Sequence, residues 1–133
     1  MLNTTIHAPA QAEAEALAAA STFGAALKAS TEFVALAAAD EAISHDAAAN
    51  VAIAAFNSLQ QTLRAEITTG ALQDSQRTEL DQRQQAMYDV PSVTVYLAAM
   101  AAFQAVCRDT AAIVSTEIGI DFAANSRSGG CCG

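Results

Sequence analysis

The stretch DVPSVTVYLAAMAAFQAVCRDTAAIVSTEIG, residues 89–119, decides the fold class. Pro91 suits the first turn of a helix, where its missing N–H has no partner to lose. After it, apolar side chains recur every three or four residues, and no Gly or Pro follows until Gly119. We therefore predict one helix over about 92–118, about 40 Å long.

This helix carries two apolar stripes. The first contains Tyr96, Met100, Phe103, Cys107, Thr110 and Val114, and the second contains Ala99, Ala102, Val106 and Ile113. A helix that is apolar on two faces is either central in its fold or shared between subunits. On this stripe we expect Cys107 to be a small buried hydrophobe.

The rest of the chain also favours helix. Alanine makes up about a quarter of the residues, while Gly and Pro number six and two. Periodicity and capping residues predict further helices over about 10–27, 31–43, 47–69 and 76–88, with Ser30 or Thr31 and Asp46 as N-caps and Gly70 as a stop. We predict an all-α fold, an antiparallel bundle of four to five helices with a long C-terminal helix, because the loops between them are short.

The domain organisation is simple. We expect a disordered lead over residues 1–9, one helical domain over 10–122 and a flexible Gly/Ser/Cys tail over 123–133. The polar helix over 76–88 has few apolar anchors, so we expect it to be a solvated arm or a surface that faces a partner. Together with the outer face of the 92–118 helix, it is our candidate interaction surface.

Charge and targeting signals narrow the function classes. The chain has fourteen acidic and six basic residues, which gives a net charge of −8, and its arginines are scattered along the sequence. Direct nucleic-acid binding needs a basic surface, so we do not expect it. We also expect a cytoplasmic protein without a membrane span, because the first nine residues lack the features of a signal peptide and the strongest apolar run, residues 96–103, is short.

Catalytic chemistry has little support. The two histidines are His7, in the lead, and His45, in a turn, and neither lies beside a likely nucleophile in the sequence. Glu41 and His45 are four residues apart, but a di-metal centre in a bundle needs a second histidine and more carboxylates. We expect no enzyme activity, and we interpret His45 as a helix-end residue favoured by the helix dipole.

The sequence GGCCG at 129–133 is the feature that bundle formation does not explain. Its two adjacent thiols, Cys131 and Cys132, are suited to a soft metal or an iron–sulfur cluster, although a cluster usually takes about four thiolates. One chain is therefore short of ligands, and other chains would have to complete a cluster. A tail without function, or a metal or redox carrier that uses this Cys pair, stays open as an alternative.

Four passages, in order, resemble the YlbF/YmcA family of control-of-competence regulators. They are LKASTEF at 27–33, FNSLQQ at 56–61, VPSVTVYLAA at 90–99 and IGIDF at 118–122, and the resemblance covers about residues 14–122. It implies a helical protein that associates with itself or with family relatives. The departures from the family pattern are the high alanine content and the acidity.

The resemblance also implies a function. Family members are non-catalytic regulators in competence, biofilm formation and sporulation, and in RNA processing through a ribonuclease partner. Some family complexes carry iron–sulfur clusters ligated by cysteines near chain ends, which implies that role for Cys131 and Cys132. We therefore expect a regulatory adaptor that acts through protein–protein contacts.

Overall fold

A computed structural model of the protein describes residues 9–127. This part of the chain is all-helical and contains no strand. Its helices are α1 (Pro9–Lys28), α2 (Thr31–Ser44), α3 (Ala47–Thr62), α4 (Arg64–Thr69), α5 (Asp74–Tyr88), α6 (Pro91–Ile118) and α7 (Phe122–Arg127). The predictions of an all-α fold and of a long C-terminal helix are confirmed.

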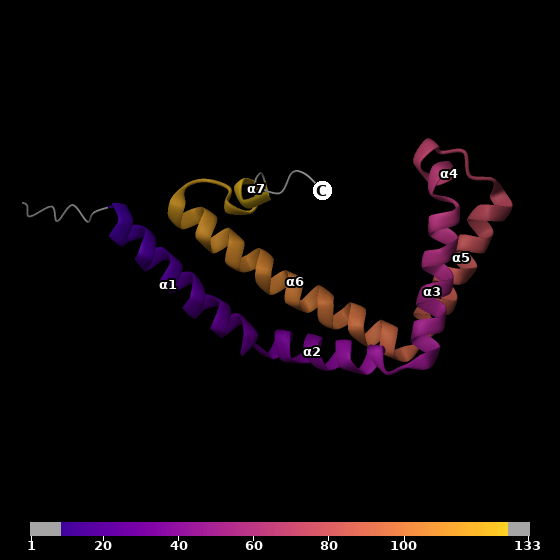
Figure 1. Cartoon of the computed structure of the whole chain (residues 1–133), viewed down its shortest axis with the longest axis horizontal. Coiled ribbons are helices and arrows are strands. Elements are labelled where there is room, and N and C mark those ends of the chain that lie inside the picture. The colour runs from indigo at the N-terminus through magenta and orange to yellow at the C-terminus, as the bar shows by residue number, and fades with distance from the viewer. Residues whose placement is uncertain (1–8, 128–133) are drawn as a thin grey trace, which may run out of the picture.

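The helices form two arms that diverge from a common corner (Figure 1). The long arm consists of α1 and α2, which follow one another with a bend, and of α6, which runs back along α2 in the antiparallel direction. The short arm consists of α3 and α4 with α5 packed against α3. At the corner, which we call the elbow, the chain crosses between the arms twice, at residues 45–46 and 89–90.

This architecture differs from the predicted bundle. The described residues form seven helices in place of four or five, and their main contacts are pairwise, α2 with α6 and α3 with α5. The expected helix over 47–69 is divided at Leu63, whose φ of −95° and ψ of 11° leave the helical region. Leu63 is 6% exposed, so the break coincides with one of the few buried side chains. Two paired arms bury only one face of most helices.

Local sequence signals set most helix ends. The Ser30 side chain accepts a hydrogen bond from the Phe33 N–H at 3.2 Å, which caps α2. Gly70 and Gly119 end α4 and α6 with φ of 70° and 72°, a left-handed conformation that a residue with a Cβ rarely adopts. Pro91 opens α6. These predicted starts and stops are confirmed.

The two chain ends are partly described. Pro9 begins α1, and residues 1–8 of the expected lead lie outside the described range. Residues 123–127 of the expected tail belong to α7, which turns back beside the end of α6 (Figure 1). Residues 128–133, with Cys131 and Cys132, lie outside the described range.

The buried core is thin. Among the described residues, the buried hydrophobic side chains are Ala39, Ala49, Leu63 and Val93. By length and composition alone, the 28-residue helix α6 is apolar enough to cross a membrane, and none of its most apolar window is buried within the described residues. One such helix is weak evidence for a membrane span, because the core helix of a soluble protein passes the same test. A chain of this composition therefore leaves much of its apolar surface uncovered in a single copy.

Candidate interaction surface

On the inner side of the long arm, aromatic and aliphatic side chains of α2 and α6 pack against each other. Phe33 on α2 and Phe103 on α6 meet edge to face, with ring centroids 5.5 Å apart and an interplanar angle of 65°. Tyr96 and Met100, on the same predicted stripe as Phe103, are half-buried. The first stripe of α6 therefore packs against α2 over the half of α6 that lies nearest the elbow.

The second stripe of α6 is covered only in part. Val95 and Ile113, which flank Ala102 on one face at helical spacing, are 59% and 64% exposed. Ala102 is exposed as well, and Val106 is half-buried. Ala99, the fourth member of the predicted second stripe, is half-buried. We define the outer stripe of α6 as Val95, Ala102, Val106 and Ile113, a set that differs from the predicted stripe in having Val95 in place of Ala99.

Helix α1 is more exposed than any sequence pattern had indicated. Every residue from 9 to 26 is exposed, including Leu17 at 64% and Phe23 at 43%. The run from Ala16 to Leu27 contains no charged residue. Sequence reasoning missed this surface because apolar spacing predicts that a face is covered, without saying whether the cover comes from the same chain. The uncharged run was the signal that pointed to it.

At the elbow, the Asp46 carboxylate accepts hydrogen bonds from three donors. The Asp46 side chain accepts from the backbone N–H groups of Ala48 and Ala49 at 3.0 and 3.2 Å and so caps α3, as predicted. Its second oxygen accepts from the Ser92 hydroxyl at 2.6 Å. The Ser92 hydrogen bond, followed by that of Ala49, lowers the pKa of Asp46 below its ordinary value of 3.8. Asp46 thus ties the start of α3 to the start of α6.

His45 has a structural place at this elbow. It is the C-cap of α2, and its Nδ1 lies 2.8 Å from the Glu41 carbonyl oxygen and 3.2 Å from the Ser44 hydroxyl. Within residues 9–127, no group of three His, Cys, Asp or Glu side chains is placed to hold a metal ion. His45 is therefore engaged with the helix end, as its sequence position predicted, and His7 lies outside the described residues.

The polar helix α5 forms the outer side of the short arm. Its predicted anchors Leu80 and Met87 are half-buried, and Tyr88 is 41% exposed. Arg83 and Glu79 face each other at 3.7 Å with both side chains about half exposed, a pair that contributes little to stability. Three further polar side chains, Gln76, Gln84 and Gln85, make hydrogen bonds within α5 or to its ends. Most of the polar side chains of α5 are exposed.

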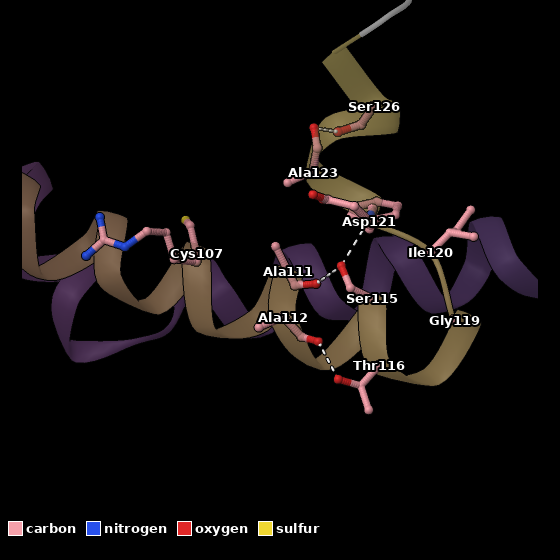
Figure 2. A pocket seen from close by; sticks show the side chains of 12 residues that line it. Cys107, Ala111, Ala112, Ser115, Thr116, Gly119, Ile120, Asp121, Ala123 and Ser126 are labelled. Carbon is pink, nitrogen blue, oxygen red and sulfur yellow. Dashed lines mark hydrogen bonds between the residues drawn. The ribbon is translucent and has the colours of Figure 1, made fainter.

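A groove of about 950 Å³ lies between α6 and α7 (Figure 2). The Ser115 hydroxyl donates to the Ala111 carbonyl at 2.7 Å and accepts from the Phe122 N–H at 3.0 Å, which fixes the turn into α7. Asp121 then caps α7 through the Ala124 N–H at 2.9 Å. The groove is mostly apolar and contains no combination of nucleophile and base within hydrogen-bond reach.

Cys107 lines this groove and is exposed, so the expectation of a buried thiol is wrong. The physical reason is the length of α2. Cys107 lies four residues after Phe103 on α6. Because α2 runs antiparallel to α6 and both helices rise by the same distance per residue, the residue opposite Cys107 is Ala29, four residues before Phe33. At that level the α1–α2 junction bends away, so the stripe continues on α6 without its cover (Figure 1).

Comparison with known proteins identifies one relationship. A family model described as control of competence regulator ComK, YlbF/YmcA, matches residues 16–119. Neither the curated proteins nor the solved structures give a match. The matched residues include α2 to α6 in full and most of α1. This long helical match, with the predicted caps in place, shows that the chain belongs to the YlbF/YmcA family.

Proposed function

We propose that this protein is a non-catalytic, cytoplasmic regulatory adaptor that acts through protein–protein contacts. The observation that carries the proposal is the large uncovered apolar surface of α1 and of the outer stripe of α6 in a chain with a thin core. Exposed apolar surfaces of this extent are typical of proteins that bind other proteins. The charged side chains, in contrast, are dispersed over solvent-exposed helix faces.

The regulated process follows from the family. Its members are described as competence regulators, and we propose developmental regulation or RNA processing as the process that this chain affects. The partners we propose are copies of this chain or family relatives, together with a ribonuclease complex. The excess of acids over bases favours protein over nucleic acid as the direct partner.

The test is complementation in cells in which the gene has been disrupted, with transcript ends and developmental markers as readouts. We expect wild type to restore them and folded Asp81→Arg on α5 or Val95→Asp on α6 to fail, because both side chains are exposed and their change alters only contacts. Full restoration by both variants would exclude these two surfaces. The control is Gln60→Glu, an exposed change on α3, away from both surfaces.

The His45→Ala variant tests whether the protein acts as an adaptor or as an enzyme. The histidine ring binds only groups of its own helix end in the described chain, so we expect a folded His45→Ala protein to complement fully. Loss of complementation, with an unchanged melting temperature and unchanged partner binding, would contradict a non-catalytic role.

We further propose that Cys131 and Cys132 donate ligands to an iron–sulfur cluster shared between chains. Two adjacent thiolates suit such a cluster, but one chain cannot complete it, because about four thiolates are needed and residues 9–127 provide no ligand group of their own. No step of the adaptor function depends on this cluster.

Anaerobic purification tests this second proposal. Wild type and the Cys131→Ser/Cys132→Ser variant are compared for iron, acid-labile sulfide, visible absorbance and oligomer size. Iron and sulfide that disappear in the variant would support a shared cluster. Bound metal without sulfide would favour the alternative, a metal or redox carrier that uses the same Cys pair, and a colourless, metal-free wild type would contradict both.

A further inference from the structure

We infer that Cys107 on α6 forms a reversible disulfide with one cysteine of the tail segment 128–133, which then occupies the groove between α6 and α7. The inference goes beyond the proposed function, since it needs neither a partner protein nor a bound cluster. It assigns a modification to an exposed thiol that has no role in the proposed function. Because the sequence has three cysteines, one of Cys131 and Cys132 stays free.

The Cys107 side chain is accessible from the groove. It is exposed, and it lines the groove together with Ala111, Ser115 and Ser126. Figure 2 shows Cys107 on α6 and Ser126 on α7, the helix that leads directly to the tail. A mostly apolar groove suits a small segment without charged side chains, and residues 128–133 have the sequence SGGCCG.

Disulfide geometry favours Cys107 over the neighbouring cysteine as the partner within one chain. Consecutive Cα atoms are about 3.8 Å apart across a trans peptide bond, whereas the Cα atoms of a disulfide are usually about 4.4–6.8 Å apart. A disulfide between Cys131 and Cys132 falls outside this range. The intrachain disulfides that can satisfy it are those that join Cys107 to Cys131 or to Cys132.

The start of α7 lies close enough to Cys107 for the tail to return to it. The Ser115 hydroxyl accepts from the Phe122 N–H at 3.0 Å, which fixes the start of α7 beside Ser115. Ser115 is eight residues, about 12 Å, along α6 from Cys107. Because Ser126 shares the groove with Cys107, α7 does not point away from this thiol.

The length of the tail matches the remaining distance. Helix α7 is about 9 Å long, so with the two helices at right angles its end lies about 17 Å from Cys107. Four extended residues from Arg127 to Cys131 span about 14 Å, and a disulfide adds about 6 Å between its Cα atoms, which gives a reach of about 20 Å. A tail cysteine can therefore reach Cys107 without any change in α6 or α7.

The chemistry is thiol–disulfide exchange, with oxidised glutathione as the oxidant. The thiolate of a tail cysteine attacks one glutathione sulfur, which forms a mixed disulfide and releases one glutathione thiolate. The Cys107 thiolate then attacks the tail sulfur of the mixed disulfide, and the second glutathione leaves. The two protein thiols lose two electrons and two protons in all, and the oxidised glutathione becomes two reduced molecules.

The disulfide competes with a metal or a cluster for the same thiols. The thiolate is the metal ligand, and a cysteine held in a disulfide has no thiolate to donate. Oxidation therefore removes one of the two tail ligands and fixes the tail against the end of α6. Disulfides in the cytosol are mostly transient ones that serve catalysis or redox sensing, and this one would be of the sensing kind.

The test equilibrates the metal-free full chain with a chelator in mixtures of reduced and oxidised glutathione, and then alkylates the free thiols. Trypsin cleaves after Arg83, Arg108 and Arg127, which places Cys107 in peptide 84–108 and both tail cysteines in peptide 128–133. We expect mass spectrometry to find these two peptides linked, in a chain that migrates as a monomer on a non-reducing gel. At about 1 µM protein, an effective concentration of about 1 mM within one chain favours the intrachain over the interchain disulfide by about 1,000-fold.

Three variants show whether the groove directs the disulfide, with far-UV circular dichroism as the check that each keeps its helices. Cys107→Ser should lose the linked peptide. Cys107→Ser/Ala111→Cys moves the thiol one turn along the same groove and should restore a link to peptide 128–133. Cys107→Ser/Val95→Cys is the matched control, because Val95 is 59% exposed on α6 but lies about 30 Å from Ser115, beyond the reach of the tail. Its intrachain linkage should be about 100-fold lower than that of wild type.

Tail thiols that pair between chains or stay capped by glutathione, with Cys107 free, would overturn the inference. Equal linkage at positions 95 and 107 would overturn it as well, because the groove would then play no part. The outcomes also separate this inference from the proposed cluster. A wild type that binds iron and sulfide but forms no link to Cys107 when metal-free would support the cluster and contradict the disulfide, and a colourless wild type that forms the link would do the reverse.

Discussion

The hydroxyl of Ser92 donates to the carboxylate of Asp46 at 2.6 Å, across 46 residues of sequence. Asp46 caps α3 of the short arm, and Ser92 lies in the first turn of α6 of the long arm. One carboxylate therefore serves both arms at the elbow. A chain with few buried side chains depends on such polar links to orient its arms.

The elbow should make stability sensitive to acid. The pKa of Asp46 is lowered in the folded chain, so its contribution is present above the ordinary value of 3.8 and is lost as pH falls through the folded pKa. We expect wild type to lose more free energy of unfolding than Asp46→Asn between about pH 5 and pH 3. Urea unfolding at fixed chain concentration measures the difference. Ser92→Ala should show an intermediate slope, and parallel pH profiles for all three proteins would contradict the assignment.

The aromatic contact should hold the long arm together. Phe103→Ala removes the ring that meets Phe33 edge to face, and we expect a loss of about 2–3 kcal/mol, less than for a fully buried ring because both are half-buried. Val34→Ala, next to Phe33 but 57% exposed, should change stability by less than about 0.5 kcal/mol. Equal losses in the two variants, measured by urea unfolding, would show that this contact does not stabilise the arm.

Leu63 should be the most sensitive position of the short arm. It is 6% exposed at the break between α3 and α4, so Leu63→Ala leaves a cavity and should cost about 2–4 kcal/mol. Ile67→Ala removes the same number of carbon atoms from a site that is 42% exposed and should cost less than about 1 kcal/mol. Thermal unfolding of the two variants compares these losses. A larger loss at Ile67 would mean that another chain covers that face.

We expect a glycine at position 119 to be needed for stability only because of its left-handed backbone conformation. Its φ is 72°, and a Cβ built at this residue meets nothing within 4 Å, so steric crowding plays no part. Gly119→Ala should therefore cost about 1 kcal/mol through the left-handed conformation. Gly119→Asn should cost less, because Asn tolerates this conformation better. If the two variants are equally stable in urea, the strain argument fails.

The local features of this fold were readable from the sequence. Ser30, Asp46 and Pro91 begin helices, and Gly70 and Gly119 end them, because each acts on backbone groups within one turn of its own position. The candidate interaction surface was predictable in part. The outer stripe of α6 followed from its second apolar face, whereas the exposure of α1 did not follow from any pattern.

The tertiary structure decided how the helices are shared between arms. Periodicity marks an apolar face but does not say which helix covers it, so a single bundle was expected where two arms form. The same limit produced the wrong expectation for Cys107, whose stripe continues past the end of α2. The Asp46–Ser92 link also joins residues far apart in sequence. Caps and helical faces are short-range properties that the chain carries in its sequence, while cover and orientation depend on contacts that exist only once the helices meet.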